Sequence, residues 1–196
     1  MNRIQPRELF NSDLRVDAAA IQGRQQPLLW YALQIHSRLA SFTSSTLNQK
    51  GYETFLPFYN SPRRWSDRIK IIKTPLFPGY MFCRFDIQNR LPVLATPGTI
   101  NIVGAGRTPI PVEDREIMAI RTIVHSGLET QAWPYLNVGA KIRIDRGPLT
   151  GLEGILVNSD KVDRLIVCVN LLHRSVAVEI DRRWASAATD GWDHRL

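Results

Sequence analysis

Runs of apolar residues, separated by short polar segments, predict alternating strands and helices over residues 27–127. Residues 28–35, Leu-Leu-Trp-Tyr-Ala-Leu-Gln-Ile, are nearly all apolar, which is typical of a strand covered on both faces. Apolar positions at roughly helical spacing then continue to Gly51, a helix stop signal. Residues 52–59 indicate a second strand, and Pro57 places it at a sheet edge or a bulge.

A further strand begins at Tyr80, directly after the sequence Pro75-Leu-Phe-Pro-Gly. The two prolines and the glycine stiffen and bend this approach, so that Phe77 and Tyr80 lie on either side of a fixed turn. Large aromatic residues with little rotamer entropy to lose suit a docking surface. A core strand with a proline at its start is the alternative, and the pattern alone favours neither.

The remaining pattern divides the chain into two domains. A helical tendency over residues 87–94 and a short strand over residues 100–103 precede a helix that opens at Pro111, with acidic residues in its first turn. Residues 128–137 have little periodicity and predict a linker. We expect residues 1–26 to form a flexible polar arm.

From residue 138 onward the pattern favours a small β-barrel. Ile142 and Ile144 alternate with charged residues, as in a half-buried strand. Glycines at Gly147, Gly151 and Gly154 permit a tightly folded loop, and short strand-like runs follow without a helix. The predicted fold class is therefore α+β, with an α/β sandwich of mainly antiparallel sheet over residues 27–127, a barrel over residues 138–186 and a tail over residues 187–196.

Composition and charge limit the kinds of partner and site that we expect. The net charge of +7 and the pI near 9.8 indicate a polyanionic partner. Cys83 and Cys168 lie in apolar runs, as expected of reduced core residues, and no His or Cys spacing predicts a metal site. No apolar run approaches the roughly 20 residues of a membrane span, and no signal peptide is visible, so we expect a cytoplasmic protein.

Positive charge is concentrated in residues 60–74, where cations surround Trp65 and only Asp67 opposes them. Basic side chains around an aromatic residue suit contact with phosphates and bases, whereas the alternative is a solvated hairpin loop. The two interpretations are equally supported. The candidate nucleic-acid contacts are His36, Arg38, Arg63, Arg64, Trp65, Arg68, Lys70 and Lys73.

Three segments, in this order, resemble the NusG family of transcription elongation factors over nearly all of residues 28–184. They are Trp30-Tyr31, Pro75-Leu-Phe-Pro-Gly-Tyr80, and a KOW motif whose core is Gly147-Pro-Leu-Thr-Gly-Leu-Glu-Gly154. The resemblance implies an N-terminal (NGN) domain that docks on the clamp helices of the RNA polymerase β′ subunit, reaches toward the β subunit and suppresses pausing. It also implies an SH3-like KOW barrel that recruits Rho or the ribosomal protein NusE.

The resemblance also assigns site residues. The polymerase-binding set is Trp30, Tyr31, Phe77, Pro78, Gly79 and Tyr80, and the KOW loop set is Gly147, Pro148, Leu149, Leu152 and Gly154. Leucines at two loop positions, where housekeeping members usually carry phenylalanines, favour a specialised UpxY-like or RfaH-like antiterminator. Such a factor acts on particular operons and is recruited through non-template DNA or nascent RNA.

Other functions fit the residues less well. A nucleophile elbow and a phosphate loop are absent from the sequence, so we expect a binding protein without catalysis, cofactor or metal. We also expect a monomer. A housekeeping NusG is the first alternative. A ribosomal or general RNA-binding KOW protein explains the charge but leaves residues 75–80 and the α/β half unused.

Overall fold

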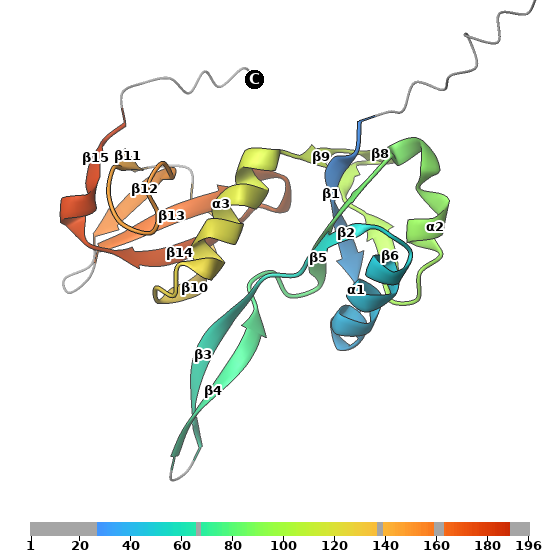
Figure 1. The fold of residues 1–196 in the computed structure, drawn as a ribbon, viewed down its shortest axis with the longest axis horizontal. Coiled ribbons are helices and arrows are strands. Elements are labelled where there is room, and N and C mark those ends of the chain that lie inside the picture. The colour runs from blue at the N-terminus through green and yellow to red at the C-terminus, as the bar shows by residue number, and fades with distance from the viewer. Residues whose placement is uncertain (1–26, 66–67, 137–138, 159–162, 189–196) are drawn as a thin grey trace, which may run out of the picture.

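The computed structural model describes residues 27–65, 68–136, 139–158 and 163–188. Two domains lie side by side, and a long β-hairpin projects from the N-terminal one (Figure 1). The fold is the mixed α+β class with antiparallel sheets that the sequence predicts. None of the described helices is long and apolar enough to cross a membrane.

The N-terminal domain is built on a five-stranded antiparallel sheet with β1 at its centre. Successive residues of β1 point to opposite faces, and both faces are buried, which accounts for its continuous apolar sequence. β1 pairs with β5, β6 and β9, and β5 also pairs with β2. The strands are β1 (Leu29–Ile35), β2 (Glu53–Phe55), β5 (Tyr80–Phe85), β6 (Thr99–Ile102) and β9 (Pro111–Val112).

Helices cover the two faces of this sheet. On one face, α1 (Ala40–Gln49) and α2 (Leu91–Leu94) enclose a core around Tyr31, Leu33 and Met81. On the other face, α3 (Asp114–His125) packs Ile117, Ile120 and Ile123 toward Trp30. Short 3-10 turns, η2 (Ser37–Leu39) and η3 (Ile87–Asn89), follow β1 and β5.

The helix predicted to open at Pro111 begins later than expected. Pro111 and Val112 pair with β1 as strand β9, and α3 starts after the extended residue Glu113. In this position Val112 pairs with Trp30 of β1 and is buried. The acidic first turn of α3 is present as predicted, with Asp114 and Glu116.

Two hairpins complete the N-terminal domain. The longer one consists of β3 (Phe58–Trp65) and β4 (Arg68–Pro75), which pair in register from Phe58↔Pro75 to Trp65↔Arg68. The shorter one pairs β7 (Gly104–Ala105) with β8 (Thr108–Pro109).

The C-terminal domain is a six-stranded antiparallel sheet in the order β10-β14-β13-β12-β11-β15. A Cβ atom at Gly154 would collide with the Ile166 carbonyl oxygen, so close approach of β12 and β13 requires glycine there. The strands are β10 (Thr130–Pro134), β11 (Ala140–Ile144), β12 (Glu153–Asn158), β13 (Asp163–Val169), β14 (Arg174–Ile180) and β15 (Ala185–Ala187), with 3-10 turns η4 (Asn170–Leu172) and η5 (Arg182–Trp184).

The segment expected to link the domains belongs largely to this sheet. Residues 130–134 form β10, and all of them pair with β14. Trp133 also lies under the Arg164 guanidinium of β13, 5.6 Å from its ring centroid. The chain therefore passes from α3 into the C-terminal sheet within a few residues, and the two domains pack closely.

Candidate functional site

The candidate site is centred on the turn from Phe77 to Tyr80. The Tyr80 amide donates to the Phe77 carbonyl oxygen at 3.0 Å, and Gly79 has a φ of +83°. Pro at the second position and a positive φ at the third define a type II turn. Glycine adopts this positive φ without the strain that a side chain would cause. The Ile35 amide donates to the Gly79 carbonyl oxygen at 2.8 Å and fixes the turn beside the end of β1.

A hollow of about 330 Å³ lies against this turn. Pro78 is exposed at its rim, and Tyr80 is half-buried. Arg38, exposed on η2, places a positive charge at the same hollow. The remaining apolar lining comes from β1, α1 and the approach to the turn, with Ile35, Ala40, Leu56 and Pro75. An apolar hollow with one cation is suited to binding a protein side chain.

The other predicted docking aromatics lie beneath this surface and not on it. Trp30 and Tyr31 are each 3% exposed, and Phe77 is 1% exposed. The Phe77 ring packs edge-on against Phe82, with centroids 5.6 Å apart. In this structure these three side chains are core residues that support the turn, and the accessible members of the predicted set are Pro78, Gly79 and Tyr80.

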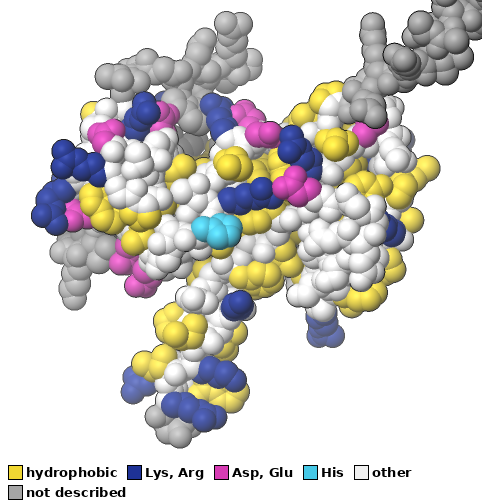
Figure 2. Space-filling model, viewed as in Figure 1, with side chains coloured by type: hydrophobic (Ala, Val, Ile, Leu, Met, Phe, Trp, Pro, Cys, Tyr) yellow, Lys and Arg dark blue, Asp and Glu magenta, His cyan; other side chains and the backbone are white. Residues whose placement is uncertain are grey.

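The predicted nucleic-acid contacts form two groups. His36 and Arg38 are exposed at the end of β1, beside the turn. The second group lies along the projecting hairpin, where Figure 2 shows dark-blue cations interleaved with yellow apolar residues. Its exposed members are Arg64, Trp65, Arg68, Lys70 and Lys73, while the backbone of Arg63 belongs to β3.

The hairpin also exposes apolar residues that the sequence analysis did not single out. Ile69 is 71% exposed, Ile71 is 68% exposed and Trp65 is 56% exposed. Strand alternation could have identified them, because Ile69 and Ile71 share one face of β4 while Arg68 and Lys70 share the other. Among the described residues, the cations of this hairpin make no ion pair.

The predicted partner loop of the C-terminal domain is mostly structural. Leu149 is fully buried in the C-terminal core, and Gly147, with a φ of +82°, lies against the Trp184 ring. Gly154 lies within β12, while Pro148 is exposed. Leu152 is half-buried and faces α3 across a groove between the domains. Of the loop set, Leu149 is therefore closed to a partner, whereas the side chains of Pro148 and Leu152 remain accessible.

The C-terminal domain packs beside the turn and partly covers it. The Arg174 guanidinium at the start of β14 lies over the Tyr80 ring, 5.8 Å from its centroid. On α3, the Glu116 carboxylate accepts hydrogen bonds from Asn170, from Nδ2 at 2.9 Å and from the backbone amide at 3.4 Å. Burial raises the pKa of Glu116, against the opposing effect of these hydrogen bonds.

These interdomain contacts could not be found from sequence. Glu116 is one of two acidic residues in the first turn of α3, where the helix dipole already explains its presence. Only the structure shows that it is buried and that its partner, Asn170, follows β13 of the other domain.

The described residues show no candidate metal site. No cluster of three or more His, Cys, Asp or Glu side chains is arranged to hold an ion within that part of the chain. Burial raises the pKa of the Cys83 thiol to about 12, which makes it a core residue without reactivity.

Comparisons with known proteins show similarity to NusG proteins. The NusG family model, described as transcription termination factor nusG, matches residues 28–121. A transcription termination/antitermination protein NusG from Thermus thermophilus is 27% identical over 124 residues, which cover 57% of this chain and 67% of that protein. Its counterpart from Campylobacter jejuni is 27% identical over 114 residues, covering 57% and 64%.

A solved structure of Thermotoga maritima NusG, described for its domain interaction, shares the fold. It superposes with a TM-score of 0.51 at 19% identity and covers 82% of this chain and 97% of that chain. The similarity to this structure therefore extends beyond residues 28–121 into the C-terminal domain.

Proposed function

We propose that the chain is a transcription elongation and antitermination factor that docks on RNA polymerase, on the premise that residues 28–121 match the NusG family model. The observation that carries the proposal is the Phe77–Tyr80 turn, with its exposed Pro78 and the apolar hollow beside it. Clamp helices of the β′ subunit are the proposed partner, because a helix presents a row of apolar side chains to such a hollow.

The proposed activity needs no catalytic group. A factor that bridges the β′ clamp and the β subunit favours the closed, moving polymerase to the extent that it binds that state more tightly. The long hairpin, with Arg64, Arg68, Lys70 and Lys73 exposed, is the proposed contact with non-template DNA or nascent RNA, because its cations suit phosphate groups. Docking and nucleic-acid contact then come from neighbouring parts of one rigid domain.

The packing of the C-terminal domain makes docking conditional. Arg174 covers part of the Tyr80 ring, so a partner that grips this ring requires the C-terminal domain to move aside. The apparent affinity for polymerase is then reduced by the fraction of molecules in which Tyr80 is uncovered. Recruitment of Rho or NusE by the released domain would use Leu152, which faces α3 while the domains are packed.

A specialised antiterminator is the form of this function that we favour over a housekeeping factor. Leu149 is buried, so the leucine at this position serves the C-terminal core, and Leu152 is the one of the two loop leucines that is accessible to a partner. Docking on polymerase does not distinguish genes, so a specialised factor needs a signal in DNA or RNA, read by the cations near the turn and on the hairpin. Occupancy across the chromosome tests this: enrichment on a few operons supports it, and presence on most transcribed genes contradicts it.

A single-round transcription assay with purified polymerase tests the proposed function. We expect the full chain to shorten pause lifetimes and Tyr80→Ala to lose this effect. Tyr52→Ala is the matched control, because Tyr52 is also half-buried but packs against Phe85 on the opposite face of the sheet. Unchanged pausing with the intact chain, or binding to ribosomal subunits in place of polymerase, overturns the proposal.

A further inference from the structure

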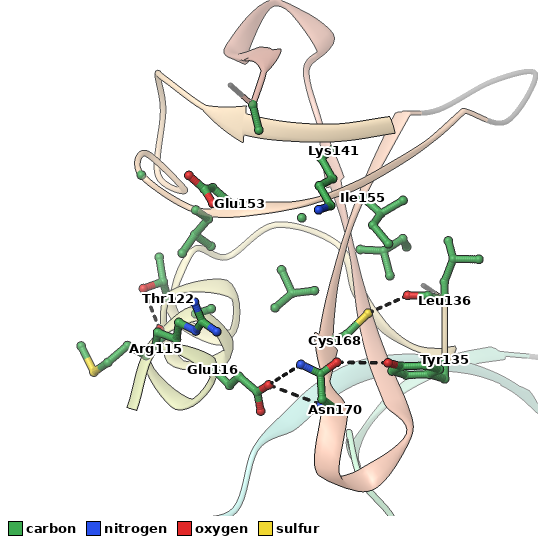
Figure 3. Close-up of a pocket in the computed structure, with 18 residues that line it drawn as sticks. Arg115, Glu116, Thr122, Tyr135, Leu136, Lys141, Glu153, Ile155, Cys168 and Asn170 are labelled. Carbon is green, nitrogen blue, oxygen red and sulfur yellow. Dashed lines mark hydrogen bonds between the residues drawn. The ribbon is translucent and has the colours of Figure 1, made fainter. Parts of the chain in front are cut away.

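A groove of about 420 Å³ runs between α3 and the sheet of the C-terminal domain. Figure 3 shows Arg115, Glu116 and Thr122 of α3 on one side, with Lys141, Ile155 and Cys168 of the C-terminal strands facing them across an open centre. The lining is largely apolar, with contributions from both domains in Met118, Ala119, Leu136, Leu152, Ile155 and Ile166.

An apolar groove of this size between α3 and the C-terminal sheet is expected to bind an apolar group. Protein interiors are close-packed, with few voids larger than a water molecule. The volume of the groove instead falls in the range of about 300–1,000 Å³ that is typical of sites that bind a ligand or a large side chain. Met118, which lines it, is 56% exposed on α3, so a substantial apolar side chain is left uncovered there.

The chain itself arrives at this groove. Strand β15 pairs with β11 along the edge of the C-terminal sheet, and the Ala188 amide then donates to the Lys141 carbonyl oxygen at 3.2 Å. Both Ala188 and Lys141 line the groove. Residues 189–196 lie outside the described part of the chain, and they continue directly from a residue in the groove wall.

The sequence of this segment fits the groove in size and contains acidic residues that could pair with Lys141 in the groove wall. Trp192 is four residues beyond Ala188, within the approximately 14 Å that four extended residues span. An indole buries about 150–250 Å² when it is fully packed, enough to cover apolar walls of this kind. Asp190 and Asp193 flank the tryptophan, and Lys141 directs its ammonium group into the groove (Figure 3).

We infer that the C-terminal segment docks in this groove with Trp192 between α3 and the C-terminal sheet. Because one wall of the groove belongs to each domain, the docked indole contacts both domains and stabilises their packing. It therefore stabilises the arrangement in which Arg174 covers Tyr80. Docking of the segment rests only on the packing of the two domains, whereas its effect on polymerase access rests on the proposed function.

Methyl resonances of the free full-length protein test the docking without polymerase. The ring current of an indole shifts nearby methyl groups, so Trp192→Leu should move the resonances of Met118, Ile155 and Ile166. Met81 and Ile102, in the core on the far face of the N-terminal sheet, should not move. Trp65→Leu removes an exposed indole from the hairpin and serves as the matched control.

A second variant approaches the same contact from the groove side. Ala119→Phe fills the groove from α3, so the fluorine resonance of 5-fluorotryptophan at position 192 should move to that of an exposed residue. Loss of the docked indole should also speed hydrogen exchange of the Asn170 amide, which donates to Glu116, about tenfold, the factor that about 1.4 kcal/mol represents.

Unchanged groove methyl resonances in Trp192→Leu overturn the inference. So do groove resonances that depend on protein concentration and not on Trp192, because these assign the groove to a second copy of the chain. Faster pause escape by the Trp192→Leu protein than by the intact chain is expected where both proposals hold. A different outcome is that the methyl shifts appear while neither the intact chain nor the Trp192→Leu protein changes the pausing of polymerase. In that case the docking stands and the proposed function fails.

Discussion

The guanidinium of Arg174 lies over the ring of Tyr80, 5.8 Å from the ring centroid. Tyr80 begins β5 in the N-terminal domain, and Arg174 begins β14 in the C-terminal domain. The contact therefore joins the candidate docking turn to the domain that packs beside it. Cation–π contacts at partly exposed sites contribute about 0.5–1 kcal/mol, an amount small enough for a partner to displace.

Tyr80→Ala should weaken polymerase binding without unfolding the protein. Truncation of a buried aromatic anchor costs about 2 kcal/mol or more at an interface, which corresponds to roughly thirtyfold in affinity. Binding to purified polymerase measures the loss, with Tyr52→Ala as the control. Disappearance of the near-ultraviolet circular dichroism of Tyr80→Ala would instead make Tyr80 a core residue.

Arg174→Gln should have the opposite effect on polymerase affinity. Removing the guanidinium from the Tyr80 ring weakens the packed arrangement by about 0.5–1 kcal/mol, so we expect affinity to rise roughly two- to fivefold. Arg182→Gln is a suitable comparison, because the partners of Arg182 among the described residues, Asp163 and Asn158, belong to its own domain. Equal affinity of both variants and the intact chain would show that Arg174 does not restrict access.

Phe77→Ala should act on stability and not on docking alone. Phe77 is 1% exposed and packs against Phe82, and truncation of a buried phenylalanine typically costs about 3–5 kcal/mol. Urea unfolding measures the loss, which should appear as a lower midpoint. A normal midpoint combined with weaker polymerase binding would return Phe77 to the docking surface.

Neutralising the hairpin cations should flatten the salt dependence of nucleic-acid binding. Removing one phosphate contact reduces the slope of log affinity against log salt by about 0.7–0.9. In the test variant, glutamine replaces Arg64, Arg68, Lys70 and Lys73. In the control variant, glutamine replaces four arginines that are exposed elsewhere, so the net charge changes equally. These are Arg90, Arg107, Arg143 and Arg146. Equal slopes for both variants would make the hairpin a solvated loop.

Domain packing should weaken as pH rises through the titration of Glu116. Burial raises the pKa of this carboxyl in the packed state, so the packed state binds a proton more readily than the unfolded chain. This stabilisation is complete below the unfolded pKa of Glu116 and is lost as pH rises through its raised value. Nearby charges act in opposite directions, since Glu113 raises this pKa and Arg115 lowers it.

Glu116→Gln should remove this pH dependence while keeping a hydrogen-bonding partner for Asn170. Urea midpoints measured between about pH 4 and pH 8 follow the effect, since the ordinary glutamate pKa lies near the lower limit. Glu129→Gln, at an exposed position, should leave the slope unchanged. A slope that persists in Glu116→Gln would assign the titration to another group.

Local patterns in the sequence were sufficient for the central strands of the N-terminal domain. β1 and β5 are recognisable because residues buried on both faces leave a continuous apolar run. The Pro78-Gly79 pair likewise specifies a type II turn by backbone preference alone. These features depend on neighbours within a few residues, so the sequence by itself determined them, along with the similarity of residues 28–121 to NusG.

Only the tertiary structure decided which of these residues are accessible. Phe77 and Tyr80 are both aromatic and stand at either end of one turn, yet the first is buried and the second is half-buried, with the Arg174 guanidinium over its ring. Strand β10 and the Glu116–Asn170 contact were equally hidden, because their partners lie in segments far along the chain. Periodicity records which face of an element is apolar, whereas exposure depends on what distant segment packs there, and that is settled only when both domains have folded.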